Sequence, residues 1–166
     1  FGTGHHGTTA GCLEVINSVM RSRRVKRVLD LGTGSGVLAI AARKLSPVQV
    51  LATDIDPIAT RVARENVRIN GIASGIALET APGFHSTAFG RHGPFDLIIA
   101  NILARPLMRM APQLAAQLEP GGDVILSGIL ASQRWKVLAA YNGVGLSHVR
   151  TIWREGWVTI HLDNRR

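Results

Sequence analysis

Three alternating glycines follow a short apolar run and form the most distinctive chemical pattern of the chain. The sequence at residues 28–36 reads V-L-D-L-G-T-G-S-G. Glycine lets the backbone turn sharply at the end of a strand, and it lets a bound ligand approach where a side chain would collide. The pattern therefore predicts a ligand-binding turn between a strand and a helix.

The spacing of the glycines indicates the class of ligand. A dinucleotide fingerprint, G-x-G-x-x-G/A, that begins at Gly32 needs glycine or alanine at position 37, where this chain has Val37. The segment instead reads G-x-G-x-G, with Asp30 two residues before the first glycine. This layout resembles the S-adenosylmethionine (AdoMet) site of class I methyltransferases. The resemblance implies that Asp30, Gly32, Gly34 and Gly36 belong to a cofactor site.

Two acids after the next apolar run compete for the role of ribose ligand. Asp54 follows the run 48–53 and lies 22 positions after Gly32. An acid about 20 residues past a glycine-rich turn can accept hydrogen bonds from both ribose hydroxyls. Asp56 precedes Pro57, so its carboxylate is better explained as the N-cap of a following helix. We expect Asp54 to hold the ribose, with Asp56 as the alternative.

Asp30 and Asn101 each have two interpretations. Asp30 either orients the glycine loop through backbone amides or faces the ammonium group of the ligand. Asn101 ends the apolar run 95–101. As a structural residue it would cap a helix or form a turn. As a functional residue it would accept, through its side-chain carbonyl, a hydrogen bond from an N–H of substrate or cofactor.

Four further blocks resemble one family in order and spacing. They are F-G-T-G-H-H-G-T-T at 1–9, D-I-D-P at 54–57, N-I-L-A at 101–104 and S-G-I-L at 127–130. With these blocks the chain resembles the ribosomal protein L11 methyltransferase family over nearly its whole length. The more usual opening in that family reads F-G-T-G-T-H-P-T-T, so His5 and Gly7 replace threonine and proline here.

The resemblance implies an activity, a cofactor and a set of contacts. The activity would be AdoMet-dependent methylation of amines, on lysine side chains or the N-terminus, of ribosomal protein L11 in the cytoplasm. AdoMet would contact Thr9, Gly32, Asp54 and Asn101, and Asn101 would also serve the reaction. Residues 1–166 would form the catalytic domain, and the family's upstream substrate-recognition domain would be missing, since the chain opens without a methionine.

The implied reaction moves a methyl group from a sulfonium to an amine by in-line displacement. A lysine amine has an ordinary pKa of about 10.4 and must be neutral to attack. The nearby sulfonium charge and desolvation would lower that pKa. The protein's main task is then to align nitrogen, methyl carbon and sulfur, an effect worth up to roughly 7–11 kcal/mol. The sequence offers no obvious general base, and Asn101 with neighbouring backbone carbonyls could aim the lone pair.

The elements that must position these residues alternate along the chain. Apolar patterns predict strands at 28–31, 48–53, 76–80, 95–101 and 123–127, helices at 8–20, 37–45, 57–70, 106–118 and 131–141, and a hairpin of 146–153 with 157–162. Thr8 or Thr9 should cap the first helix, residues 81–93 should form a loop, and Pro120-Gly121-Gly122 should form a turn. This order predicts an α/β, Rossmann-like open sheet, mainly parallel with a C-terminal antiparallel hairpin and helices on both faces. Ligands of such sheets bind beyond the carboxyl ends of the strands.

Composition limits the other functions. The 166 residues are 46% hydrophobic, which suits one domain with its own core, and no apolar run approaches the roughly 20 residues of a membrane span. The single Cys12 permits no internal disulfide and should pack on a helix face, in a reducing, cytoplasmic setting. His5 and His6 are joined by no cluster of cysteines or acids, which argues against a metal site. Trp135, Trp153 and Trp157 are expected in core or hairpin packing.

The net charge of +8 raises nucleic acid as a partner. Five basic residues lie just before the first strand, namely Arg21, Arg23, Arg24, Lys26 and Arg27. Aromatic residues make up only 5% of the chain, so base-stacking platforms are scarce and a solvated basic face is preferred. Because of this charge, an AdoMet-dependent methyltransferase of RNA, DNA or a small molecule is the alternative interpretation. An AdoMet- or nucleotide-binding module without catalysis is a third interpretation.

Overall fold

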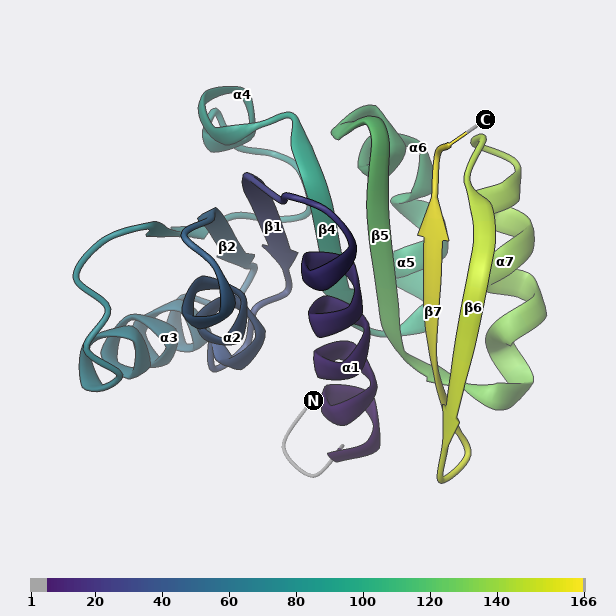
Figure 1. The fold of residues 1–166 in the computed structure, drawn as a ribbon, viewed down its shortest axis with the longest axis horizontal. Coiled ribbons are helices and arrows are strands. Elements are labelled where there is room, and N and C mark those ends of the chain that lie inside the picture. Colours follow the sequence, from purple (N-terminus) through teal and green to yellow (C-terminus); the bar gives the residue numbers. More distant parts are fainter. Residues whose placement is uncertain (1–5, 166) are drawn as a thin grey trace.

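Seven strands form one mixed sheet in a computed structural model that describes residues 6–165, in the order β3-β2-β1-β4-β5-β7-β6 (Figure 1). The strands are β1 (Arg27–Leu31), β2 (Gln49–Asp54), β3 (Ile76–Thr80), β4 (Phe95–Asn101), β5 (Leu118–Leu130), β6 (Ser147–Arg154) and β7 (Trp157–Asp163). Strands β1 to β5 pair in parallel, and β7 pairs antiparallel with both β5 and β6. The predicted open sheet, mainly parallel with a C-terminal antiparallel hairpin, is confirmed.

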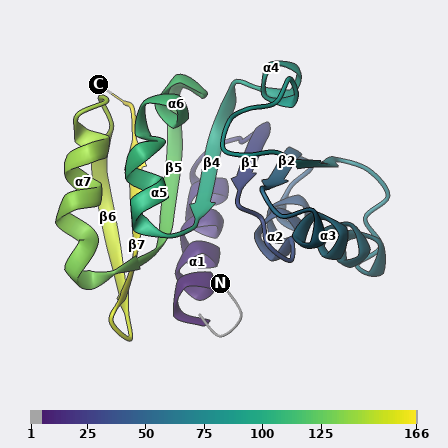
Figure 2. The same ribbon diagram turned by 180° about the vertical axis from the view of Figure 1, so that it is seen from behind.

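Helices cover both faces of the sheet (Figures 1 and 2). They are α1 (His6–Ser22), α2 (Val37–Leu45), α3 (Pro57–Ile69), α4 (Ala88–His92), α5 (Ala104–Arg109), α6 (Ala111–Ala116) and α7 (Arg134–Asn142), with a 3-10 turn η1 (Ala131–Gln133). Helix α1 lies on one face, and α5, α6 and α7 lie together on the other. No helix described between residues 6 and 165 is long and apolar enough to span a bilayer.

The core lies in two layers, one on each face of the sheet. Strand β4 shows how they form, because successive side chains of a strand point to opposite faces. Leu97 and Ile99 pack in the cluster that includes α1, while Ile98 packs in the cluster that includes α5 to α7. Cys12 lies on α1 within the first cluster, fully buried as expected, and burial raises the pKa of its thiol to about 12. The thiol therefore stays protonated at neutral pH.

Some predicted boundaries were wrong. Helix α1 begins at His6, so Thr8 and Thr9 lie inside its first turn and do not cap it. The predicted loop 81–93 contains the short helix α4, because Phe89 is buried in the core and draws this segment against the sheet. Five residues are too few to show helical periodicity in the sequence.

The segment predicted as one helix at 106–118 is two short helices, α5 and α6. Pro112 lies in the first turn of α6, where its missing N–H would leave a gap in a continuous helix. Strand β5 begins at Leu118 and already includes the expected turn 120–122, which forms an irregularity in the strand. The pairing with β4 moves from Phe95–Leu118 to Leu97–Asp123 across it.

Candidate functional site

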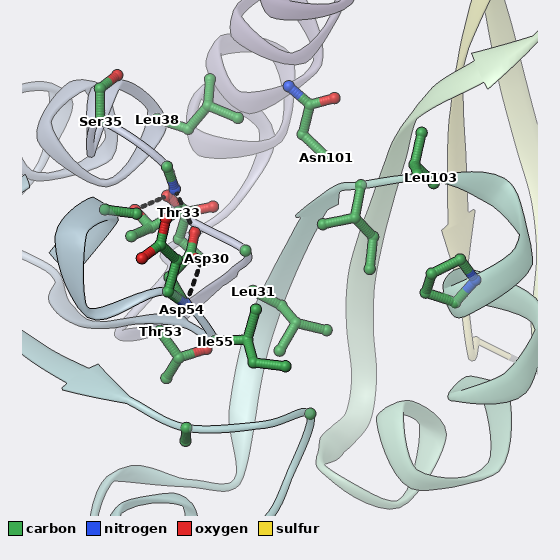
Figure 3. A pocket seen from close by; sticks show the side chains of 18 of the residues that line it. Asp30, Leu31, Thr33, Ser35, Leu38, Thr53, Asp54, Ile55, Asn101 and Leu103 are labelled. Carbon is green, nitrogen blue, oxygen red and sulfur yellow. Dashed lines mark hydrogen bonds between the residues drawn. The ribbon is translucent and has the colours of Figure 1, made fainter. Parts of the chain in front are cut away.

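A cavity of about 680 Å³ lies at the carboxyl ends of β1, β2 and β4 (Figure 3). Most of the predicted site residues line it, namely Thr9, Asp30, Gly32, Gly34, Asp54 and Asn101. Gly36 does not line it. A side chain at Gly36 would press on Ala63, with a Cβ–Cβ distance of 3.2 Å, so this glycine allows α2 and α3 to pack closely.

The glycine loop runs from β1 to α2 in a conformation that side chains disfavour. Gly32 has a φ of 73° and Gly34 a φ of 56°. A Cβ at Gly32 would collide with the side chain of Ile102, whereas a Cβ at Gly34 would meet nothing within 4 Å. The N–H of Thr33 donates to the carbonyl of Thr53 at 2.8 Å and ties the loop to β2. The loop is thus fixed at one end and open to the cavity at Gly34.

Asp30 orients this loop from beneath. Its carboxylate is buried, and Oδ2 accepts hydrogen bonds from the hydroxyl of Thr33 at 2.7 Å and from the N–H of Ala39 at 3.2 Å. Burial raises the pKa of Asp30 to about 6, against the lowering effect of these two hydrogen bonds. The geometry supports the first interpretation, in which Asp30 orients the glycine loop and the first turn of α2.

The hydrogen bonds of Asp54 and Asp56 show that the two carboxylates have different roles. Asp56 caps α3, because its Oδ1 accepts from the N–H of Ile58 at 2.9 Å and Pro57 occupies the first turn. Its predicted capping role is confirmed. Asp54 faces the cavity, where its Oδ2 accepts from the N–H of Gly34 at 2.9 Å and its Oδ1 from the N–H of Asp56 at 3.0 Å. A carboxylate is thus held at the glycine loop, where the sequence predicts the ribose of a nucleoside ligand.

Asn101 carries an unpartnered oxygen at the cavity. Among the described residues, three buried side-chain polar atoms lack a hydrogen-bond partner, and two of them, Asn101 Oδ1 and Thr53 Oγ1, belong to residues that line this cavity. An unpartnered buried polar atom costs about 1–3 kcal/mol. The N-cap of α5 is Leu103, so Asn101 does not cap that helix. An amide oxygen without a protein partner is available to an N–H of a ligand.

Thr9 reaches the cavity from the first turn of α1. The turn is held against the sheet by hydroxyl groups, since Ser127 Oγ lies 3.4 Å from the carbonyl of Thr8 and 3.1 Å from Thr159 Oγ1. A side chain at Gly11 would collide with Thr159, so glycine permits this close approach. The sequence did not predict these contacts, because they join α1 to strands more than 100 residues away along the chain.

A further part of the cavity wall is apolar and was not predicted. Its side chains come from the loop after β2 and from the segment between β4 and α6, and include Ile55, Ile102, Leu103, Pro106 and Met110. Ile55 is 70% exposed although it is large and apolar. A concave site with apolar walls and a few convergent polar groups is typical of sites for organic ligands.

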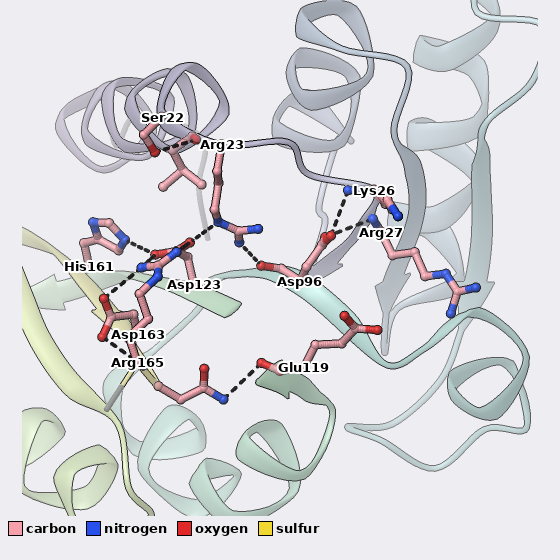
Figure 4. A network of polar contacts seen from close by, with 12 residues as sticks. Ser22, Arg23, Lys26, Arg27, Asp96, Glu119, Asp123, His161, Asp163 and Arg165 are labelled. Carbon is pink, nitrogen blue, oxygen red and sulfur yellow. Dashed lines mark hydrogen bonds and ion pairs between the residues drawn. The ribbon is translucent and has the colours of Figure 1, made fainter. Parts of the chain in front are cut away.

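At the end of the central strands opposite to the cavity, a polar network surrounds Asp123 of β5 (Figure 4). Asp123 is 2% exposed and accepts from Arg23 Nε at 2.7 Å, from Arg165 Nη2 at 2.9 Å and contacts His161 Nε2 at 2.8 Å. Burial alone would raise the pKa of Asp123, but these partners hold it well below its usual range. Arg23 therefore belongs to a structural ion pair, unlike its exposed neighbours Arg21, Arg24, Lys26 and Arg27.

Other candidates from the sequence have different outcomes. No group of three His, Cys, Asp or Glu side chains that could hold a metal occurs within the described residues; His5 and the His6 side chain lie outside them. The prediction that Trp135 packs in the core or the hairpin was wrong. This side chain belongs to α7, is 74% exposed and lies beside the guanidinium of Arg134. Trp153 lies in the hairpin, and the same guanidinium lies 5.2 Å from its ring centre.

Comparisons with known proteins agree with the geometry. The family model for ribosomal protein L11 methyltransferase (PrmA) matches residues 1–165. The ribosomal protein L11 methyltransferase of Rhizobium rhizogenes is 82% identical over 163 residues, and that of Agrobacterium fabrum is 77% identical over 162 residues. Each alignment covers 98% of this chain and 56% of the relative, so the chain spans just over half the length of these curated relatives.

Solved structures of methyltransferases have the same fold. The ribosomal protein L11 methylase of Lactobacillus delbrueckii subsp. bulgaricus superposes with a TM-score of 0.87 at 36% identity, over 98% of this chain and 81% of that one. An RNA methyltransferase from Salinibacter ruber, in complex with S-adenosyl-L-homocysteine, has a TM-score of 0.68 at 21% identity, over 92% and 91% of the two chains, and shows the fold alone. The chain belongs to the ribosomal protein L11 methyltransferase (PrmA) family.

Proposed function

We propose that this chain is the catalytic domain of an AdoMet-dependent methyltransferase that acts on amines of ribosomal protein L11. The observation that carries the proposal is one cavity, in a chain of this family, that joins the glycine loop, the Asp54 carboxylate and the unpartnered oxygen of Asn101. The curated relatives bear the name of that activity. A cytoplasmic location fits a ribosomal substrate.

The residues present fit AdoMet. The cavity volume of about 680 Å³ lies within the range of roughly 300–1,000 Å³ common for small-molecule sites. Gly34 leaves open space for the ligand, and Asp54 offers two carboxylate oxygens to the ribose hydroxyls. The apolar side chains of Ile55 and Ile102 offer surface to the base. Thr9 approaches from α1 to complete the site.

When bound, AdoMet supplies a methyl group on a positively charged sulfur. In the transfer the carbon–sulfur bond breaks as a nitrogen–carbon bond forms, and the amine gives its proton to solvent. Asn101 Oδ1 accepts an N–H of the neutral amine and so directs the nitrogen lone pair. Asp30 and Asp54 are already bonded to the loop, so neither carboxylate is assigned the role of base. Alignment, rather than proton abstraction, is then the main contribution of the protein.

A labelling experiment tests this function. The chain is incubated with methyl-labelled AdoMet and either isolated ribosomal protein L11 or total ribosomal RNA. Label in the protein, with little in the RNA, is expected, and Asn101→Ala should abolish it while AdoMet affinity falls only a few-fold. Label in RNA alone would favour the alternative of a nucleic-acid methyltransferase. AdoMet binding without any transfer, even for a full-length relative, would favour a binding module.

A further inference from the structure

Thr53 carries a buried hydroxyl that no protein group satisfies. It lies in β2, one residue before Asp54, and is 1% exposed. Its Oγ1 has no hydrogen-bond partner among the described residues, yet the residue lines the cavity. The backbone carbonyl of Thr53 is used, since it accepts from the N–H of Thr33. The side chain is therefore left without a partner.

Every other buried hydroxyl group in the described part of the chain has an interaction. Thr33 donates to Asp30, Thr60 bonds to Thr80 at 2.8 Å, Ser127 bonds to Thr159, and Tyr141 donates to the carbonyl of Leu107. Thr8 is also engaged. Valine has the same shape as threonine and would suit a buried strand at position 53 without leaving a polar atom unpaired. The hydroxyl of Thr53 thus lowers the stability of the free protein, because no hydrogen bond within the protein offsets its burial.

The position of Thr53 indicates which part of a ligand it faces. Side chains alternate along β2, so Thr53 points to the sheet face opposite Asp54, the face that Leu31 shares through its pairing with Thr53. Figure 3 shows Thr53 beside Ile55, with Asp54 between it and the glycine loop. Under the proposed function the ribose lies at Asp54, and the base would then occupy the adjoining part of the cavity, which Leu31, Ile55 and Ala81 line.

We propose that the Thr53 hydroxyl donates a hydrogen bond to a ring nitrogen of the adenine of AdoMet. This inference rests on the proposed function and extends it by assigning the base contact. Ring nitrogens are acceptors, and a threonine hydroxyl can turn its hydrogen toward them. Because Thr53 Oγ1 has almost no accessible surface in the ligand-free structure, the contact requires a small shift of the side chains that cover it. Ligand binding then satisfies a group that the free protein leaves unpaired. The contact distinguishes adenine from a ring that lacks the acceptor.

Two variants and two readouts test the assignment. Thr53→Val removes the hydroxyl at constant shape, and Thr53→Ser retains it. Calorimetric titration with S-adenosylhomocysteine should show a dissociation constant about five- to tenfold weaker for Thr53→Val and within about twofold of wild type for Thr53→Ser. Without ligand, the melting temperature of Thr53→Val should equal or exceed that of wild type, because an unpaired buried hydroxyl has been removed.

Deaza analogues of S-adenosylhomocysteine identify the nitrogen. For one of them, in which CH replaces the ring nitrogen that Thr53 contacts, wild type and Thr53→Val should bind equally well. Equal affinity of the two proteins for the natural ligand would overturn the inference, as would a lower melting temperature of ligand-free Thr53→Val. A wild-type chain that binds neither AdoMet nor its product would instead overturn the proposed function, so the two failures are distinguishable.

Discussion

Replacement of Asp54 by alanine should weaken AdoMet binding about a hundredfold. The carboxylate is held by the N–H groups of Gly34 and Asp56, at 2.9 and 3.0 Å, and we propose that it also accepts both ribose hydroxyls. Hydrogen bonds to a charged group contribute about 1.5–3 kcal/mol each. A total loss of about 3 kcal/mol for two partly solvated bonds corresponds to roughly a hundredfold change in dissociation constant.

The same substitution should also lower stability, because two backbone N–H groups lose their acceptor. About 2 kcal/mol of unfolding free energy corresponds to a drop in melting temperature of roughly 4–8 °C for a domain of this size. Asp56→Ala is the matched control. It removes the N-cap of α3, so it should cost about 1 kcal/mol of stability and leave the affinity within about twofold.

Isothermal titration calorimetry gives the affinities, and differential scanning calorimetry gives the stabilities of the ligand-free proteins. The reasoning would be refuted if Asp56→Ala lost the affinity and Asp54→Ala kept it. The assignment of the ribose to Asp54 would also be wrong if the loss of affinity in each variant merely followed its loss of stability, with no additional loss in Asp54→Ala. Asp54→Asn refines the result, since it keeps one acceptor oxygen and should bind more tightly than Asp54→Ala.

Three further predictions concern the glycine loop, the polar network around Asp123 and the protein substrate. Gly34→Val places a branched side chain at a positive φ on the open side of the loop, so AdoMet binding should be lost while circular dichroism shows the fold retained; unchanged affinity would contradict the site. Asp123→Asn should cost about 3 kcal/mol in denaturant unfolding, because it removes the carboxylate that pairs with Arg23 and one of the two carboxylates that pair with Arg165; a loss below about 1 kcal/mol would contradict the network. Because the pKa of Asp123 is depressed in the folded state, its contribution is full above the unfolded value of about 4 and is lost as pH falls below it, so the difference between wild type and variant should shrink in acid. Finally, this chain should bind AdoMet as tightly as a full-length relative but methylate isolated ribosomal protein L11 much more slowly, since remote binding contacts align the amine; equal transfer rates would place recognition within these 166 residues.

Local patterns were enough to predict most of the fold. Apolar runs located all seven strands, and the runs 146–153 and 157–162 located the hairpin. Its turn residues, Glu155 and Gly156, both have a positive φ, as a tight two-residue turn requires. The proline that follows Asp56 was enough to distinguish this capping acid from Asp54. These features depend on neighbours within a few residues, which a sequence displays directly.

The missed features depend on distance in space. Arg23 and Asp123 are 100 positions apart, so no spacing rule pairs them. Phe89 of helix α4 is buried in the core, whereas α7 buries Val137, Leu138 and Tyr141 and leaves Trp135 exposed. Thr53 reads as one more residue of an apolar strand, and only the structure shows that its hydroxyl lacks a partner.

The central claim is that the cavity at the carboxyl ends of β1, β2 and β4 binds AdoMet. Isothermal titration calorimetry, with AdoMet titrated into the purified chain, tests this claim most directly. We expect saturable binding to one site per chain, competed by S-adenosylhomocysteine. A folded chain that releases no heat of binding with AdoMet at concentrations up to the millimolar range would contradict the claim.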